Sequence, residues 1–232
     1  MDIREPVETA FSPIHLNSRN PAIDFLSQAD TKLASLIRLV GDLSIIPSSN
    51  PFESLVMSII SQQLSAKAAA TIKSRVKLVL PSVTPDLVLA ADEEAIRQCG
   101  VSYPKIRYIR DLSGKVLAGE VQLDELHKLE DDVLIKQLVS VKGIGTWTAE
   151  MFLIFALGRP DIMSLGDVGL QRAAKWLHCL EDRPDGNYLG LVAPAWAPYR
   201  SFASLYLWRS IDKGYVDSGL QVEACQPGQS YS

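Results

Sequence analysis

Residues whose types and spacing suggest chemistry are concentrated in the stretch SVKGIGTWTAE, residues 140–150. Gly143 and Gly145 allow a positive φ and a close backbone approach, so they predict a tight turn between two helices. The second helix is expected to begin near Thr146, and its first amides would point outward without an intrahelical acceptor. Such a helix end, with Lys142 beside it, favours binding of a phosphate. The alternative is a plain corner between two helices, in which the glycines only permit the turn.

Asp167 is the second candidate, in the stretch MSLGDVGLQRA. It occupies the expected N-cap of another helix, and aspartate is among the best N-cap residues, so capping alone would account for it. The same location favours an ionised carboxylate, because the helix dipole stabilises negative charge there. An ionised carboxylate at the edge of a cleft would stabilise a developing cation or orient a water molecule.

The segments that must position these residues are predicted to be helical almost throughout. The clearest start is NPFESLV, where Asn50 would cap a helix and Pro51 would take its first position. No segment shows a convincing two-residue alternation typical of a strand. The sequence therefore predicts an all-α protein. We expect residues 1–20 to be an N-terminal arm, residues 21–215 a helical domain of two interleaved lobes, and residues 216–232 a flexible tail.

Composition places the chain among ordinary globular proteins. It has 232 residues, of which 47% are hydrophobic and 22% charged. No apolar run reaches the roughly 18 residues that a membrane span needs, and the start MDIREPVETA lacks the layout of a signal peptide. An intracellular protein that does not associate with membranes is expected. The three cysteines, Cys99, Cys179 and Cys225, lack metal-ligand spacing, which argues against zinc and iron–sulfur sites.

The net charge of −4 argues against a broad surface that coats nucleic acid, but the charge is unevenly distributed along the chain. No acidic residue occurs from Ser54 to Pro85, and a second basic run extends over residues 97–115. These runs would form a local phosphate-binding face, or they are solvated helix faces. The basic residues concerned are Lys67, Lys73, Arg75, Lys77, Arg97, Lys105, Arg107, Arg110 and Lys115.

Several stretches together resemble one family. LVSVKGIGTWTAEMFLIFALGRPDIMSLGDVGLQRA resembles the helix–hairpin–helix and Gly/Pro…Asp segment of the base-excision DNA glycosylase superfamily, known as HhH-GPD. NPFESLVMSIISQQLSAKAAATI and PYRSFASLYLWRS match its 3-methyladenine DNA glycosylase II, or AlkA-like, branch. The resemblance covers Asn50 to Ser210 and implies two helical lobes around a cleft. Only a short segment precedes the first predicted helix, so we expect the compact form without the extra mixed α/β lobe of larger bacterial members.

The resemblance implies a monofunctional DNA glycosylase acting in base excision repair. The catalytic aspartate of the family falls on Asp167. Bifunctional relatives, which also cut the strand, carry a nucleophilic lysine where this chain has Trp147, and without an amine no Schiff base forms there. The expected activity is flipping of alkylated bases, 3-methyladenine and 7-methylguanine, followed by hydrolysis of the N-glycosidic bond. Hypoxanthine, ethenoadenine and 1-methyladenine remain alternative substrates.

The resemblance also places three residues at the base pocket, namely Trp147, Met151 and Tyr199. A methylated purine nucleoside of this kind is cationic, and an aromatic ring stacked on a cation gains roughly 0.5–2 kcal/mol. The alternative is that neither aromatic residue contacts a base. Trp147 would then be a core residue between two helices, and Tyr199 would be a half-buried aromatic at a helix start.

A flipped base leaves a gap in the duplex that related enzymes fill with a side chain, the wedge. The stretch SQQLSAKAA occupies the corresponding place, which makes Gln63 or Leu64 the candidate wedge. Gln63 aligns better with the family, and Leu64 is the better apolar wedge. The alternative for this stretch is a polar break in a long helix.

The hairpin of the family contacts DNA phosphate and can hold a monovalent cation. The phosphate contacts would be Lys142, Gly143, Gly145, Thr146 and Thr148. The resemblance alone places Na⁺ or K⁺ on the main-chain carbonyls of Val139, Val141 and Ile144, and no other cofactor is expected.

The expected partner is double-stranded DNA with damaged bases, bound by a monomer. The expected location is the cytoplasm or nucleoid, or the nucleus in a eukaryote. Two alternatives remain open, a glycosylase for oxidised or mismatched bases and a non-catalytic helix–hairpin–helix DNA-binding protein. In the second alternative, Asp167 would serve only as a helix cap.

Overall fold

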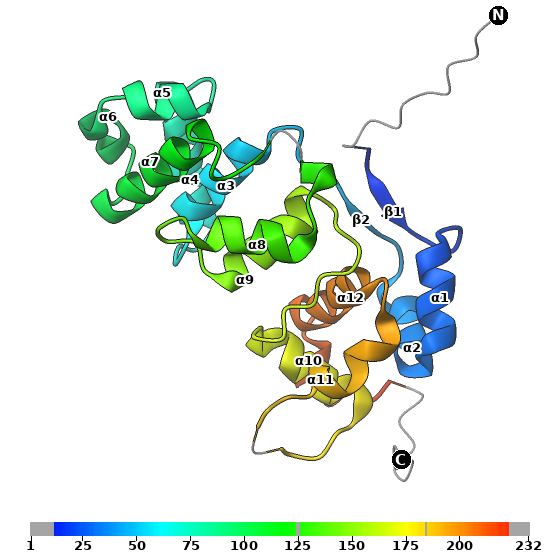
Figure 1. The fold of residues 1–232 in the computed structure, drawn as a ribbon. Helices are drawn as coiled ribbons and strands as arrows, with labels where there is room; N and C mark the ends of the chain where they lie inside the picture. The colour runs from blue at the N-terminus through cyan, green and yellow to red at the C-terminus, as the bar shows by residue number, and fades with distance from the viewer. Residues whose placement is uncertain (1–11, 124–125, 184, 223–232) are drawn as a thin grey trace, which may run out of the picture. The chain divides into compact units, whose positions relative to one another are not determined.

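The computed structural model describes residues 12–123, 126–183 and 185–222. These residues form two compact units (Figure 1). The continuous unit is Ser48–Leu157, and the discontinuous unit combines the described residues of Met1–Pro47 and Gly158–Ser232. The predicted all-α class is confirmed, because helices dominate both units.

The discontinuous unit is built from segments at both ends of the chain. Its helices α2, α10 and α12 pack against one another, and α1 packs on α2. It contains β1 (Ile14–Leu16), α1 (Pro21–Ala29), α2 (Thr31–Val40), β2 (Leu43–Ile45), α10 (Val168–His178), α11 (Leu189–Val192) and α12 (Arg200–Asp212), with short 3₁₀ segments at Ala193–Trp196 and Tyr215–Asp217.

A polar network at Asp30 lies within the core of the discontinuous unit. Asp30 caps α2 by accepting the N–H groups of Lys32 and Leu33, each at 3.0 Å. Its other carboxylate oxygen accepts the indole N–H of Trp196 at 2.8 Å and lies 3.2 Å from Nε2 of His178. Because the side chains of Trp196 and His178 are almost fully buried, this carboxylate connects a helix start to the core.

Two short strands depart from the predicted absence of strands. Ile14–Leu16 pairs with Leu43–Ile45 in an antiparallel ladder, and Leu16 is fully buried in the core. This part of the predicted N-terminal arm is therefore a packed element, and residues 1–11 lie outside the described residues. A three-residue strand is too short for a visible alternation, and its pairing depends on a partner distant in sequence.

The predicted C-terminal tail is also packed over its first part. Tyr215–Asp217 forms a 3₁₀ turn, the carbonyl of Leu220 accepts the indole N–H of Trp176 at 2.9 Å, and Val222 is buried. Val222 adds apolar area to the core of the discontinuous unit, which offsets the entropy of ordering this segment. Residues 223–232 lie outside the described residues.

The regular elements among the described residues of the continuous unit are all helices, and α7 packs against α3, α5 and α6. The N-terminus of α3 begins as predicted, because Asn50 accepts the N–H of Glu53 at 3.0 Å and Pro51 is the first helical residue. The unit contains α3 (Pro51–Ser61), α4 (Ala66–Val79), α5 (Pro85–Ala90), α6 (Glu93–Gln98), α7 (Tyr103–Leu117), a 3₁₀ segment (Leu126–Lys128), α8 (Asp131–Val139), α9 (Thr146–Met151) and a π-helical segment (Phe152–Ala156). Within the described residues, no helix is long and apolar enough to cross a membrane.

Candidate functional site

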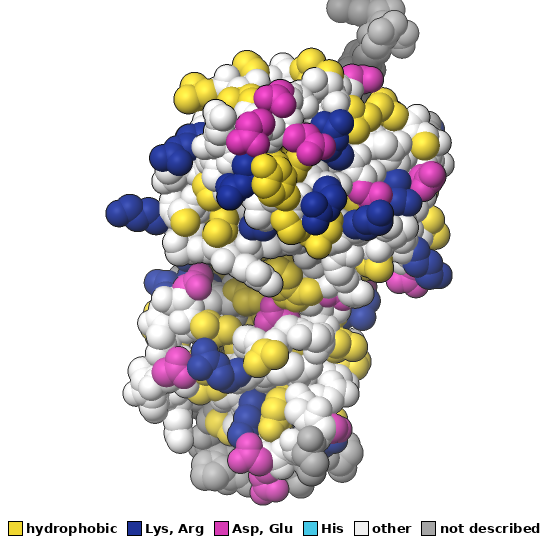
Figure 2. Space-filling view, turned by 90° about the vertical axis from the view of Figure 1, so that its left-hand side faces the viewer, with side chains coloured by type: hydrophobic (Ala, Val, Ile, Leu, Met, Phe, Trp, Pro, Cys, Tyr) yellow, Lys and Arg dark blue, Asp and Glu magenta, His cyan; other side chains and the backbone are white. Residues whose placement is uncertain are grey.

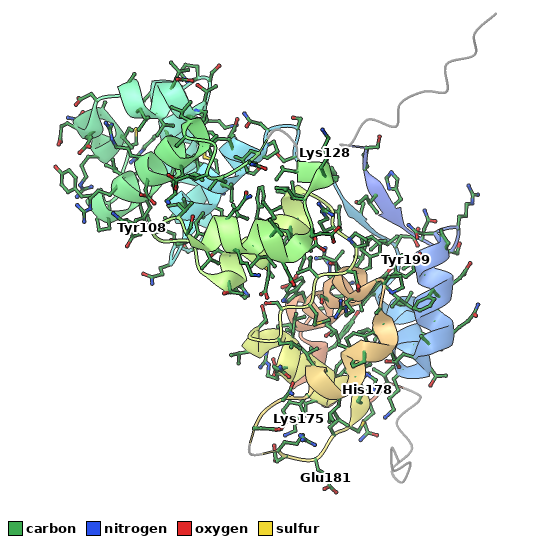
Figure 3. The ribbon with its side chains drawn as sticks, in the orientation of Figure 1. Tyr108, Lys128, Lys175, His178, Glu181 and Tyr199 are labelled. Carbon is green, nitrogen blue, oxygen red and sulfur yellow. The ribbon has the colours of Figure 1, made fainter. Side chains whose placement is uncertain are left out.

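The hairpin turn, residues 140–145, joins α8 to α9 as the sequence predicts. Gly143 has a φ of +83°, and a Cβ atom built there would lie 2.6 Å from Cε2 of Tyr108 (Figure 3). Gly145 differs, because its φ is −92° and no heavy atom lies within 4 Å of a Cβ built there. Only one of the two glycines therefore uses the left-handed region. The other leaves open space in front of the start of α9.

Two side chains from elsewhere in the continuous unit hold the hairpin turn. The carboxylate of Asp111 on α7 accepts the main-chain N–H of Lys142 at 2.9 Å. The side-chain amide of Gln62 donates to the carbonyl of Gly143 at 2.9 Å. The side chain of Lys142 is exposed and forms no ion pair with any described residue. Its ammonium group is therefore accessible to an anion at the surface.

The N-terminus of α9 offers main-chain donors. Its N-cap is Gly145, and no side chain caps the helix. Thr146 is exposed, whereas the side chain of Thr148 is only 9% exposed. Thr148 therefore presents its main-chain N–H in the first turn rather than its hydroxyl group, which limits how it contacts a phosphate.

The three carbonyls predicted to hold a cation differ in their hydrogen bonding. The carbonyl of Val141 accepts the N–H of Ile144 at 3.1 Å, which leaves one lone pair for another partner. Among the described residues, no main-chain N–H donates to the carbonyls of Val139 and Ile144. Side-chain ligands are not offered, because no group of three His, Cys, Asp or Glu side chains in the described chain is arranged to hold a metal. The residues present therefore fit a cation held by main-chain oxygens.

Trp147 lies in the first turn of α9 and is 53% exposed. The structure therefore does not support the alternative in which Trp147 is a core residue between two helices. Met151, one turn later, ends α9 and is half-buried. Trp147 can offer a ring face to a ligand, and Met151 presents part of its side chain on the same helix.

The wedge turn, residues 62–65, separates α3 from α4, so this stretch connects two helices rather than interrupting one long helix. Gln63 is exposed in the left-handed region with a φ of 58°, and Leu64 is 37% exposed. Ser65 caps α4 by accepting the N–H of Ala68 at 3.3 Å. Both wedge candidates are thus on an exposed turn, and their geometry leaves the choice between them open.

In the discontinuous unit, Asp167 is the N-cap of α10 and is 9% exposed. One carboxylate oxygen accepts the N–H of Leu170 at 2.8 Å, so the predicted cap is confirmed. A Cβ atom built on Gly169 would lie 3.1 Å from that same oxygen, which shows how closely the helix start approaches the carboxylate. Sequence reasoning missed Gly169, although DVG at a helix start is a local signal for such an approach.

Tyr199 lies at the start of α12 and is half-buried (Figure 3). This position agrees equally with the alternative in which Tyr199 has only a structural role. Its ring makes an edge contact with Phe25 of α1, with ring centroids 5.4 Å apart. It also stacks against Phe202, with centroids 6.0 Å apart. Phe25 was missed in the sequence because nothing local marks its contact with a residue so distant along the chain.

The predicted basic face is only partly available for DNA. Four of its nine members form ion pairs or bind main-chain carbonyls, so they would bind phosphate only by breaking these contacts. Figure 2 shows Lys and Arg side chains intermixed with Asp and Glu on the face that it presents. Three of these four basic residues form ion pairs, namely Lys77 with Glu53 at 2.6 Å, Arg110 with Glu93 at 3.4 Å and Lys115 with Glu120 at 2.7 Å. The fourth, Lys105, donates hydrogen bonds to main-chain carbonyls.

Comparisons with known proteins agree with this arrangement. The family model described as HhH-GPD superfamily base excision DNA repair protein matches residues 56–189. The chain is 33% identical over 192 residues to DNA-3-methyladenine glycosylase 1 of Schizosaccharomyces pombe, covering 80% of this chain and 84% of the relative.

Two solved structures of DNA glycosylases are similar to this chain in fold. DNA-3-methyladenine glycosidase from Bacillus halodurans superposes with a TM-score of 0.81 at 39% identity, covering 88% of this chain and 95% of that one. The S. pombe 3-methyladenine DNA glycosylase in complex with abasic DNA superposes with a TM-score of 0.71 at 33% identity, covering 83% and 97%.

Proposed function

This chain belongs to the HhH-GPD superfamily of base excision DNA repair proteins, and we propose that it is a monofunctional DNA glycosylase for alkylated bases. Its substrates are 3-methyladenine and 7-methylguanine in duplex DNA, and its reaction is hydrolysis of the N-glycosidic bond. The observation that carries the proposal is the carboxylate of Asp167, which is 9% exposed at the start of α10. The similarity to proteins named DNA-3-methyladenine glycosylases supports the choice of substrate.

Asp167 acts on the sugar in this proposal. A carboxylate is an anion at neutral pH. As the bond to the base lengthens, positive charge develops on the deoxyribose, and a nearby fixed anion stabilises that charge or orients the attacking water. The hydrogen bond from Leu170 fixes one oxygen of the carboxylate, which holds the group in one orientation.

Trp147 binds the base in this proposal. The target base must leave the stack to be reached, at a cost of a few kcal/mol. A 53% exposed indole offers a face on which a cationic base stacks. A cationic base is a good leaving group, so no strong general acid is needed. Met151, which ends the same helix and is half-buried, is assigned to the base-binding site beside Trp147, and Tyr199 is assigned a base contact by the resemblance alone.

The enzyme has no lyase activity in this proposal. A lyase of this family needs an amine at position 147 to form a Schiff base with the sugar, and tryptophan has none. The product is therefore an abasic site in an intact strand. A solved structure of the S. pombe relative contains abasic DNA in complex with that protein.

The hairpin turn and the start of α9 bind a DNA phosphate in this proposal. The donors are the main-chain N–H groups around Gly145, Thr146 and Thr148, with Lys142 adding positive charge. A monovalent cation on the carbonyls of Val139, Val141 and Ile144 would add positive charge at the same place, since carbonyl oxygens can replace a hydration shell. Either Gln63 or Leu64 fills the gap left by the flipped base.

The protein acts as a monomer in this proposal, and it acts wherever the cell keeps its DNA. Duplex DNA treated with a methylating agent provides the test, with released bases separated by chromatography. We expect free 3-methyladenine and 7-methylguanine, and strand breaks only after alkali treatment. Binding to DNA without release of any base would favour the non-catalytic alternative. Strand cleavage without alkali would contradict the assignment of Trp147.

A further inference from the structure

Lys105 on α7 makes a contact that the proposed function does not use. Its ammonium group donates to the carbonyl of Ile60 at 2.8 Å and to that of Gln62 at 2.6 Å. The side chain is half-buried, and burial lowers the pKa of Lys105. The ammonium group of Lys105 is therefore engaged within the protein, although Lys105 belongs to a basic run in the sequence.

The two carbonyls need such a donor because α3 ends there. The last carbonyls of a helix have no intrahelical donor and carry the negative end of the helix dipole. An ammonium group has three donors and can satisfy two carbonyls at once. The chain then turns sharply, with Gln63 at a φ of 58°. Lys105 thus stabilises the point at which the wedge turn leaves α3.

The wedge turn is also tied to the hairpin turn. The main-chain carbonyl of Gln62 binds Lys105, and its side-chain amide donates to the carbonyl of Gly143 at 2.9 Å. Two further residues of α7, Tyr108 and Asp111, contact the hairpin turn at Gly143 and at the N–H of Lys142. Lys105, Tyr108 and Asp111 are spaced by three residues, which places them along one face of α7.

We propose that Lys105 and Gln62 are positioning residues that couple the wedge turn to the hairpin turn. One face of α7 then holds both turns in a fixed relation, so that phosphate binding at the hairpin turn places residues 63–64 for insertion into the duplex. The inference rests on the proposed function for the roles of the two turns. It adds that a half-buried cation, bound to main-chain carbonyls of the protein, controls the position of the wedge.

The test monitors wedge insertion without requiring base release. A duplex carries a tetrahydrofuran abasic-site analogue with 2-aminopurine as the neighbouring base, whose fluorescence rises when it is unstacked. The variants are Lys105→Met and Gln62→Ala. Lys115→Met is the matched control, because it removes the same charge from the same helix where Lys115 pairs with Glu120 at the surface.

We expect Lys105→Met to reduce the fluorescence change at saturating protein by about tenfold, and Gln62→Ala by about threefold, since charged hydrogen bonds are the stronger ones. Lys115→Met should match the wild type. All variants should bind undamaged duplex within about twofold of wild type, because the phosphate contacts remain. Thermal unfolding monitored by circular dichroism establishes that each variant is folded.

A wild-type fluorescence change from both folded variants would overturn the inference, as would an equal loss in Lys115→Met. If Lys105→Met does not fold, Gln62→Ala decides, because its half-exposed side chain makes a single hydrogen bond. Base release by the wild type is measured in parallel. Absence of release and of any wild-type fluorescence change would instead reject the proposed function.

Discussion

Replacing Gly143 with alanine should destabilise the continuous unit strongly, whereas the same replacement at Gly145 should destabilise it much less. The two glycines are two residues apart in one turn, so their substitutions form a matched pair. At Gly143 the backbone is left-handed and the new Cβ would meet Cγ, Cδ2 and Cε2 of the Tyr108 ring. At Gly145 the backbone has an ordinary φ of −92° and the Cβ would enter open space.

The magnitude follows from two separate costs. A non-glycine residue in the left-handed region costs roughly 1–2 kcal/mol. Inserting a methyl group into a packed contact costs typically 1–3 kcal/mol, because the Tyr108 ring must move. Gly143→Ala should therefore lower the free energy of unfolding by about 2–5 kcal/mol. Gly145→Ala replaces only an N-cap glycine and should cost about 1 kcal/mol or less.

Urea denaturation followed by circular dichroism measures both costs, and a double mutant separates them. Tyr108→Ala removes the ring, so adding Gly143→Ala to it should cost only the backbone part, about 1–2 kcal/mol. Equal stability of the Gly143→Ala and Gly145→Ala proteins would refute the reasoning. A Gly143→Ala cost unchanged by the removal of Tyr108 would show that the ring contact is not its cause.

Three further predictions concern the base pocket and the core. Trp147→Ala should lower 7-methylguanine release by about 2- to 30-fold, the equivalent of the cation–π energy, and hypoxanthine release by less, in single-turnover assays. Burial alone would raise the pKa of Asp30, but hydrogen bonds and the charge of His178 outweigh it and lower the pKa below its usual value. The contribution of Asp30 to the free energy of unfolding is therefore fully present above the pKa of the unfolded state, and it is lost as the pH falls through the lower pKa of the folded state. Asp30→Asn should make the urea midpoint depend less on pH in the acid range. Burial raises the pKa of Tyr206 to about 12. Stability should therefore fall from about pH 10 towards 12, and Tyr206→Phe should remove part of that loss in the same titration.

Features governed by local rules could be predicted from the sequence. Asn50 followed by proline marks the start of α3, and Asp167 marks the start of α10, because a cap acts within a few residues. The hairpin turn was visible from its two glycines, although their different conformations were not. Gly143 is left-handed beneath Tyr108, and that ring comes from a helix more than thirty residues earlier.

Features that depend on distant contacts could not be predicted. Lys105 looks like any other member of a basic run, and only its contact with the carbonyls of Ile60 and Gln62 distinguishes it. The strand at Ile14–Leu16 exists because Leu43–Ile45 pairs with it, and neither carries a local signal of its own. Such contacts arise from tertiary packing, which a reading of local patterns does not include.

Asp167→Asn tests the central claim most directly, because asparagine caps a helix as well as aspartate does while lacking the charge. The measurement is the single-turnover rate of 7-methylguanine release from methylated duplex, beside the urea midpoint and the affinity for an abasic-site analogue. We predict a fall in rate of about 100-fold or more, the range typical of lost electrostatic stabilisation, with the midpoint and affinity little changed. A variant that releases the base at the wild-type rate would show that Asp167 is only a cap and would contradict the account.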